Sequence, residues 1–343
     1  MQIDYGTFTF SLEAKEVILL PSYKGSTLRG GFGYAFKRVI CAIKDKECPD
    51  CLLKEKCVYS YVFETPPPSD TKIMRKYKSA PHPFIIEPPP EKRRGFIPGN
   101  EINFGLTLIG RAIDYLPYFI YTFDELGRMG IGKGKGQYLL KEVSSQESKV
   151  KSEKTIENEE AVIPAKAGIQ GNSAISKIIY DSETKTLKSF SHRLLPFEIE
   201  LESEARSPEH LTIEFLTPTR IVYDGHFIFD LEFHMLIRQL LRRISLLSYF
   251  HCGGDPSEID FKGTIEKAKE IKVKEKNLRW HDWERYSARQ DARMKMGGFV
   301  GEITFEGDIG PFMPLIQAGE VLHVGKGTSF GLGKYEVKGI SFD

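Results

Sequence analysis

Two glycine-rich segments with interleaved lysines lie in the middle and near the end of the chain, and both lead into a short apolar stretch. Residues 127–136 have the sequence GRMGIGKGKG and precede QYLL, whereas residues 325–333 have the sequence GKGTSFGLG and precede KYEV. Clustered glycines favour tight backbone turns, and the stretches after them have the composition of strands. This shared ending predicts that the chain contains two copies of one structural unit.

Hydrophobic periodicity before each segment supports the repeat. In the first half, residues 8–12 and 102–109 alternate apolar and polar side chains, as half-buried strands do, and apolar residues between 28 and 39 recur at helical spacing. In the second half, strand-like residues 211–220 precede a long apolar helix over about 230–249. Both halves therefore run strand, helix, strands, helix, glycine-rich loop, strand, which predicts an α+β fold of two tandem ferredoxin-like domains.

The domain boundaries follow from length and local composition. A chain of 343 residues exceeds the usual single-domain size. Residues 144–176 are polar, charged and poor in aromatic side chains, which is typical of an exposed loop or linker. We therefore expect a first domain over 1–143, an exposed insertion over 144–194 and a second domain over 195–343.

Charge and hydropathy exclude little about function. The chain has 48 Lys and Arg against 47 Asp and Glu, so net charge favours neither a nucleic acid nor an acidic partner. No apolar run is long enough to span a membrane, and the N-terminus lacks the pattern of a secretion signal. We expect a cytoplasmic protein that does not associate with a membrane.

The second glycine-rich segment has the composition of a phosphate-binding loop. Glycine lets backbone amides approach a phosphate closely, and lysine adds a point charge. The Walker pattern is absent, and the segment leads into a strand, so a nucleotide-binding enzyme is disfavoured. The alternative is a tight hairpin that merely requires positive φ. Lys133 and Lys135 lie in the first segment, and the residues expected to contact phosphate in the second are Gly325, Lys326, Gly327, Gly331, Gly333 and Lys334.

Four cysteines follow the first expected helix in the pattern C-x(6)-C-x(2)-C-x(5)-C, at Cys41, Cys48, Cys51 and Cys57. Thiolates at such spacing can form the tetrahedral shell of a structural zinc ion, and we expect such an ion to stabilise the loop that carries them. An iron–sulfur cluster uses the same all-cysteine chemistry. Four unrelated buried thiols are the remaining alternative. A four-cysteine shell leaves no open position, so no catalytic metal is expected.

A basic segment over 262–295 places Arg285, Arg289 and Arg293 at four-residue spacing, which would align them along one face of a helix. Such a stripe, next to Trp283 and Tyr286, could bind RNA through phosphate charge and base stacking. A solvated helix face is the alternative.

Among the histidines, His251 follows a long apolar helix and precedes two glycines. An exposed imidazole there could transfer a proton near neutral pH. His234 lies within the apolar pattern of that helix, where a core role is the usual one.

Taken together, these segments resemble the Cas6-type CRISPR-associated endoribonucleases of the RAMP superfamily, in the branch with a cysteine cluster after the first helix. The resemblance implies two ferredoxin-like domains that cleave CRISPR repeat RNA into mature guide RNA (crRNA). It also implies metal-independent attack of the ribose 2′-hydroxyl on the adjacent phosphate, which leaves a 2′,3′-cyclic phosphate. The matching segments are residues 24–33 (KGSTLRGGFG), the four cysteines, and residues 240–254, 283–290, 297–302 and 323–333.

The chain departs from this family at the first helix, where many members carry the proton-transferring histidine. Residues 28–41 contain no histidine, but they offer Arg29, Tyr34 and Lys37. Either His251 reaches the site from the second half, or a Tyr/Lys pair acts instead. We expect His251, Tyr34 and Lys37 to be catalytic and Arg29 to bind RNA. The alternative is a non-catalytic RNA-binding RAMP subunit of a CRISPR effector complex.

Overall fold

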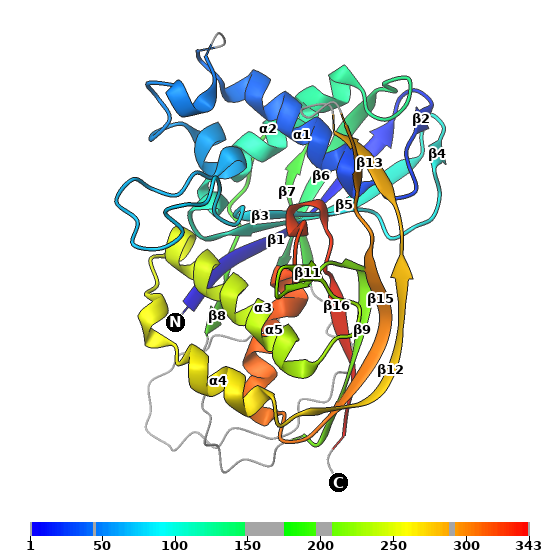
Figure 1. Cartoon of the computed structure of the whole chain (residues 1–343). Helices are drawn as coiled ribbons and strands as arrows, with labels where there is room; N and C mark the ends of the chain where they lie inside the picture. The colour runs from blue at the N-terminus through cyan, green and yellow to red at the C-terminus, as the bar shows by residue number, and fades with distance from the viewer. Residues whose placement is uncertain (1, 44–45, 148–174, 197–207, 288–291, 342–343) are drawn as a thin grey trace, which may run out of the picture.

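Two sheet-and-helix units lie one above the other in the computed structural model, with the first half of the chain uppermost (Figure 1). The structure describes residues 2–43, 46–147, 175–196, 208–287 and 292–341. Within them, no helix is both long and apolar enough to cross a membrane.

The first half has the strand order β3-β5-β1-β6, with every neighbouring pair antiparallel. Helices α1 and α2 connect the strands, so the chain runs β1, α1, β3, β5, α2, β6. The bounds are β1 (Gln2–Ala14), α1 (Gly25–Ile40), β3 (Phe84–Glu87), β5 (Glu101–Ile109), α2 (Leu116–Met129) and β6 (Tyr138–Glu147). A short ladder joins β2 (Ile18–Leu19) to β4 (Gly95–Phe96).

The second half repeats this topology, with the strand order β12-β15-β9-β16. Its chain runs β9, α3, β12, β15, α5, β16, and a further short helix, α4 (Phe261–Ala268), follows α3. The identical order of strands and helices confirms the predicted α+β fold of tandem ferredoxin-like domains. The bounds are β9 (His210–Thr219), α3 (Phe233–Leu247), β12 (Lys272–His281), β15 (Gly298–Glu306), α5 (Met313–Leu322) and β16 (Tyr335–Ser341).

Each half has its own hydrophobic core, built by the periodicities that the sequence displays. Along β1, Phe8, Phe10 and Leu12 face inward, because alternate strand residues point to one face of the sheet. Phe32 of α1 stacks on Phe119 of α2 with ring centroids 4.7 Å apart. Aromatic packing thus fixes both helices of the first half on their sheet.

The expected insertion is shorter than predicted. β6 continues to Glu147, β7 (Ile175–Asp181) pairs with β6, and β8 (Arg193–Pro196) pairs with β1. Residues 175–196 therefore extend the first sheet. Ile179 and Tyr180 are buried in the first core, which is what attaches this polar segment. Residues 148–174 lie outside the described part of the chain.

The prediction of a basic helix within 262–295 is wrong beyond α4, where the structure has strands. β12 pairs along its length with β15, and β13 (Glu284–Ser287) pairs with β14 (Ala292–Lys295) in a hairpin. Sheet pairing overrides the helical spacing of the arginines, so Arg285 and Arg293 lie on opposite strands. Arg289 lies outside the described residues.

Candidate nucleic-acid interface

The glycine-rich loop between α5 and β16 lies between the two halves and is largely buried. All four predicted loop glycines, Gly325, Gly327, Gly331 and Gly333, have positive φ. A Cβ on Gly333 would lie 1.8 Å from the Val324 carbonyl oxygen, and one on Gly331 would lie 2.4 Å from Pro88. These glycines serve a tight turn that packs against the first half, as the hairpin alternative requires.

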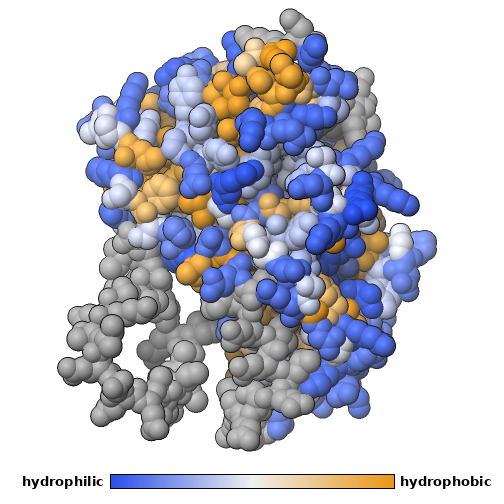
Figure 2. Space-filling view, turned by 90° about the vertical axis from the view of Figure 1, so that its left-hand side faces the viewer, coloured by the Kyte–Doolittle hydropathy of each residue, from blue (hydrophilic) through white to orange (hydrophobic). Residues whose placement is uncertain are grey.

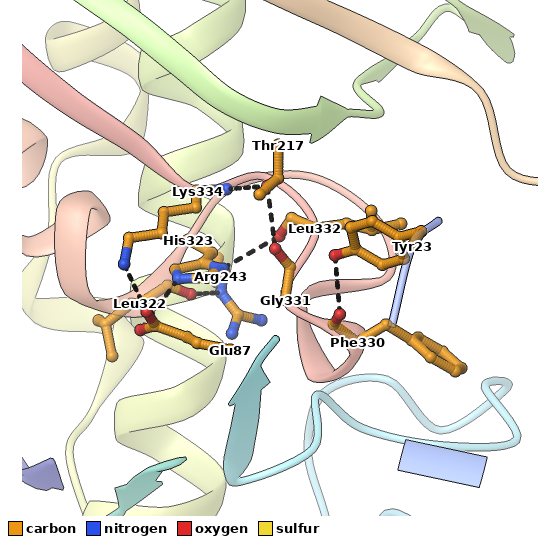
Figure 3. Close-up of polar contacts among 10 residues, drawn as sticks. All are labelled: Tyr23, Glu87, Thr217, Arg243, Leu322, His323, Phe330, Gly331, Leu332 and Lys334. Atoms are coloured by element: carbon orange, nitrogen blue, oxygen red, sulfur yellow. Dashed lines mark hydrogen bonds and ion pairs between the residues drawn. The ribbon is translucent and has the colours of Figure 1, made fainter. Parts of the chain in front are cut away.

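Hydrogen bonds from both halves hold the loop (Figure 3). Tyr23 of the first half donates its hydroxyl to the Phe330 carbonyl at 2.8 Å. Thr217 at the end of β9 donates to the Gly331 carbonyl and accepts from the Lys334 amide, both at 2.9 Å. The loop is therefore fixed before any ligand binds.

An ion pair crosses from the loop to β3. Lys334 Nζ lies 2.5 Å from Glu87 Oε2, and His323 Nε2 lies 3.4 Å from Glu87 Oε1. Burial alone would raise the pKa of Glu87, but His323 and Lys334 outweigh it and lower the pKa to about 2. Lys334, predicted to contact RNA, thus has a protein carboxylate as its partner.

Two arginines from opposite halves lie over the Phe330 ring. The guanidinium carbon of Arg29 on α1 is 4.8 Å from the ring centroid, and that of Arg285 on β13 is 4.6 Å. Beside them, Tyr23 packs on Trp283 with ring centroids 4.6 Å apart. The loop, the start of α1 and the β13–β14 hairpin therefore meet in one cationic and aromatic junction.

Two arginine side chains near this junction have a buried donor without a partner. Arg285 Nε and Arg220 Nε are buried and have no hydrogen-bond partner among the described residues. Burial also lowers the pKa of both guanidinium groups. A phosphate would supply the missing acceptors.

The remaining predicted lysines are exposed and are divided between the two glycine-rich loops. Lys326 extends over the Phe227 ring, with Nζ 5.7 Å from the centroid. Lys133 and Lys135 lie in the first glycine-rich loop, where the Lys133 amide donates to the Leu19 carbonyl at 2.8 Å. Only Lys326 of these three belongs to the second loop.

His251 is not exposed, contrary to expectation. Its side chain is held by the Tyr61 hydroxyl at 3.0 Å from Nδ1 and by the Pro81 carbonyl at 2.8 Å from Nε2, and the residue is 7% exposed. Burial lowers the pKa of His251 to about 4, against the opposing effect of the Pro81 hydrogen bond. No hydrogen bond joins His251 to Tyr34 or Lys37 within the described residues. Tyr34 is 65% exposed on the solvent side of α1.

Sequence reasoning missed His82. Arg29 Nη2 donates to His82 Nε2 at 3.2 Å, and His82 Nδ1 lies 2.8 Å from Thr65 Oγ1. Burial, followed by the charge of Arg29, lowers the pKa of His82 to about 3. Its position between two prolines, just before β3, carried no helix or metal pattern that could have signalled it. A neutral His82 orients Arg29 toward the junction.

The four cysteines do not come together as a metal site in the described part of the chain, where no group of three or more His, Cys, Asp or Glu side chains could hold an ion. Burial raises the pKa of Cys48, to which Cys41 and Cys57 are close enough to contribute. The Cys41 thiol donates to the Ile43 carbonyl at 3.2 Å. The four-cysteine metal site, with zinc or an iron–sulfur cluster, stays a prediction.

Comparisons with known proteins match both halves. Residues 3–167 match the AF_1859 N-terminal domain family, and residues 213–335 match the family CRISPR-associated endoribonuclease Cas6. An uncharacterized protein of Archaeoglobus fulgidus is 23% identical over 325 residues, which cover 93% of each chain.

Solved structures share the fold at low identity. A product complex of Thermus thermophilus Cas6 is 17% identical, with a TM-score of 0.53 and coverage of 97% of this chain and 100% of that one. A partial Cas6-RT-Cas1–Cas2 complex is 13% identical, with a TM-score of 0.53 over 99% of this chain and 46% of that one.

The tandem ferredoxin-like domains, with the glycine-rich loop between them, are the fold that these solved structures share with this chain. The second domain matches the Cas6 family model over most of its length. The cysteine-cluster branch stays a prediction.

Proposed function

We propose that this chain is a metal-independent endoribonuclease that cleaves CRISPR repeat RNA to mature crRNA. The observation that carries the proposal is the convergence of Arg29 and Arg285, from opposite halves, on the ring of Phe330. Arg285, whose buried Nε has no hydrogen-bond partner among the described residues, and the nearby Arg29 suit a backbone phosphate, and the neighbouring aromatic rings suit a base. The Cas6 match over 213–335 supports RNA as the ligand.

The proposed reaction is attack of a ribose 2′-hydroxyl on the adjacent phosphorus. An O2′–P bond forms and the P–O5′ bond breaks, which gives a 2′,3′-cyclic phosphate and a 5′-hydroxyl. The step needs a base, an acid for the leaving oxygen and a cation for the crowded phosphorane. RNA supplies its own nucleophile, so this scheme requires no metal-bound water.

We assign the cationic role to Arg29 and Arg285, and proton transfer to Tyr34 and Lys37. Tyr34 and Lys37 are three residues apart on α1 and therefore neighbours on its surface. Tyr34 lies roughly 7.5 Å along the helix axis from Arg29, at 1.5 Å per residue. His251, held at both ring nitrogens, becomes a positioning residue for the Pro81–His82 segment behind Arg29.

The experiment is incubation of the purified chain in EDTA with repeat RNA and with the same RNA carrying a 2′-deoxy substitution at the scissile nucleotide. Cleavage of the ribose substrate alone supports the proposal. The second candidate, a non-catalytic RNA-binding subunit of an effector complex, predicts tight, salt-sensitive binding without product. The burial of His251 favours this candidate, because the histidine expected to be an exposed acid or base is not accessible to RNA.

A further inference from the structure

An arginine–aromatic strip adjoins the interface on the side of α3. Tyr77 comes from the loop before β3, and Arg238 and Arg242 come from α3. Tyr223 and Phe227 come from the hairpin of β10 (Val222–Tyr223) and β11 (His226–Phe227), and Lys326 comes from the glycine-rich loop. Of these residues, Lys326 is the one that the sequence patterns assigned to RNA binding.

Cations and rings alternate along the strip. Arg242 lies over Tyr77 with its guanidinium carbon 5.7 Å from the ring centroid. Arg238 lies 5.5 Å from the centroid of Tyr223. Together with Lys326 over Phe227, these pairs place three positive charges next to three aromatic rings.

The pairs form one continuous surface. Arg242 Nη2 donates to the Tyr77 hydroxyl at 3.5 Å. This hydrogen bond and the charge of Arg242 lower the pKa of Tyr77, and Lys326 contributes a smaller effect in the same direction. Tyr77 therefore lies within reach of both α3 and the glycine-rich loop. On the other side, the Lys326 amide donates to the Arg220 carbonyl at 2.9 Å, beside the cationic junction.

The strip is open to solvent and has an excess of positive charge. Tyr77 is 54% exposed and Phe227 is 47% exposed. The loop around Tyr77 has the sequence KIMRKYK over residues 72–78, and its lysines and arginine are exposed. Arg75, Arg238 and Arg242 form no salt bridge with any residue that the structure describes. On the side of the molecule drawn in Figure 2, hydrophilic residues lie between scattered hydrophobic patches.

We propose that this strip binds single-stranded RNA, a few nucleotides long, that leads away from the phosphate held at Phe330. Exposed rings flanked by cations are the pattern of a stacking platform, in which bases contact aromatic faces and phosphates contact arginine and lysine. An acidic protein partner would use the charges but not the rings. The proposal deepens the proposed function, because it names where the RNA beyond the cleavage site lies.

The test uses the full chain and a fluorescein-labelled, unstructured oligouridine of about 12 nucleotides, a length typical of such surfaces. Binding is measured by anisotropy for the wild type, for Y77A/F227A and for R238Q/R242Q. The matched control is Y121A/K262Q, which removes an exposed ring and an exposed charge on α2 and α4. An abasic oligomer of the same length serves as a second probe, and polyglutamate as a competitor.

We expect Y77A/F227A to bind oligouridine about tenfold more weakly, as loss of base stacking requires, and the abasic oligomer as the wild type does. R238Q/R242Q should weaken both probes and reduce the salt-dependence slope by about 1.4, or 0.7 per phosphate contact. The control should bind like the wild type.

Wild-type binding by Y77A/F227A, or equal losses for both probes, would overturn the proposal. Displacement of oligouridine by polyglutamate at equal charge would overturn it too, because the surface would then select anions rather than RNA. If the wild type binds oligouridine through the strip but does not cut repeat RNA, the endoribonuclease proposal is wrong and the proposal that the strip binds RNA is supported.

Discussion

Lys334 Nζ in the glycine-rich loop lies 2.5 Å from Glu87 Oε2 on β3, so a carboxylate of the first half anchors the loop of the second. The pKa of Glu87 is lowered to about 2 from a usual 4.5. A lowered carboxyl pKa contributes stability that is present above about pH 4.5 and lost as pH falls through about 2.

We therefore predict that E87Q lowers the free energy of unfolding at pH 7 by about 3 kcal/mol, because a pKa lowered from 4.5 to about 2 corresponds to an energy of about that size. Urea unfolding at several pH values measures this. Between pH 4.5 and 2 the wild type should lose stability more steeply than E87Q does. E101Q is the matched control, since the Glu101–Lys141 pair is exposed, and its curve should parallel the wild type. Equal acid sensitivity of E87Q and the wild type would show that the Glu87–Lys334 ion pair does not stabilise the fold.

A second prediction concerns Arg285, whose buried Nε has no hydrogen-bond partner among the described residues. R285A should weaken binding of repeat RNA at least about tenfold, because a charge-assisted contact to phosphate is lost. It should also reduce the salt-dependence slope by about 0.7–0.9. R128A is the control, since Arg128 is an exposed cation that pairs with Asp124. An unchanged slope in R285A would show that this residue does not contact phosphate.

Burial lowers the pKa of His251 to about 4, which gives a third prediction. The unfolded chain binds the extra proton between about pH 6.5 and 4, so the folded state loses stability as pH falls through that window. Replacement by Gln should flatten the pH dependence there and shift the pH–rate profile of cleavage little. If H251Q instead abolishes cleavage and removes an inflection near neutral pH, His251 is a catalytic residue and the structural reading of it is wrong.

The assignment of proton transfer to Tyr34 and Lys37 on α1 is tested by Y34F and K37A. Each should lower the single-turnover cleavage rate at saturating RNA by about 10²-fold or more, the usual contribution of a general acid or base. The dissociation constant for uncleavable 2′-deoxy RNA should change far less. The neighbouring R38A is the control, since Arg38 is exposed on the same helix. Wild-type rates in both variants would show that other residues transfer the protons.

The repeated topology could be predicted from the sequence because local patterns carry it. Alternation in β1, helical spacing in α1 and the glycines before β16 each reflect a single element and its burial. The hairpin of β13 and β14 could not be found this way, since its arginine spacing suits a helix and the strands form through pairing between segments. The same holds for β7, which follows a polar stretch and takes its place at the edge of the sheet through pairing with β6 and through two buried residues, Ile179 and Tyr180.

The candidate site was predicted in its parts but not in its arrangement. Arg29, Arg285 and the glycine-rich loop were each expected to contact RNA, and the structure brings them together at Phe330. The burial of His251 and the contact between Arg29 and His82 depend on how the two halves pack, which no local pattern records. For the same reason the sequence did not indicate that Lys334 pairs with Glu87.

The most direct measurement of the central claim is product analysis after incubation of repeat RNA with the purified chain in EDTA. Mass spectrometry of the fragment upstream of the cut identifies its 3′ end. The proposed reaction leaves a 2′,3′-cyclic phosphate on that fragment and a 5′-hydroxyl on the other, and it does not cleave the 2′-deoxy substrate. A 3′-hydroxyl end, a strict need for added divalent cation, or cleavage of the 2′-deoxy substrate would contradict it.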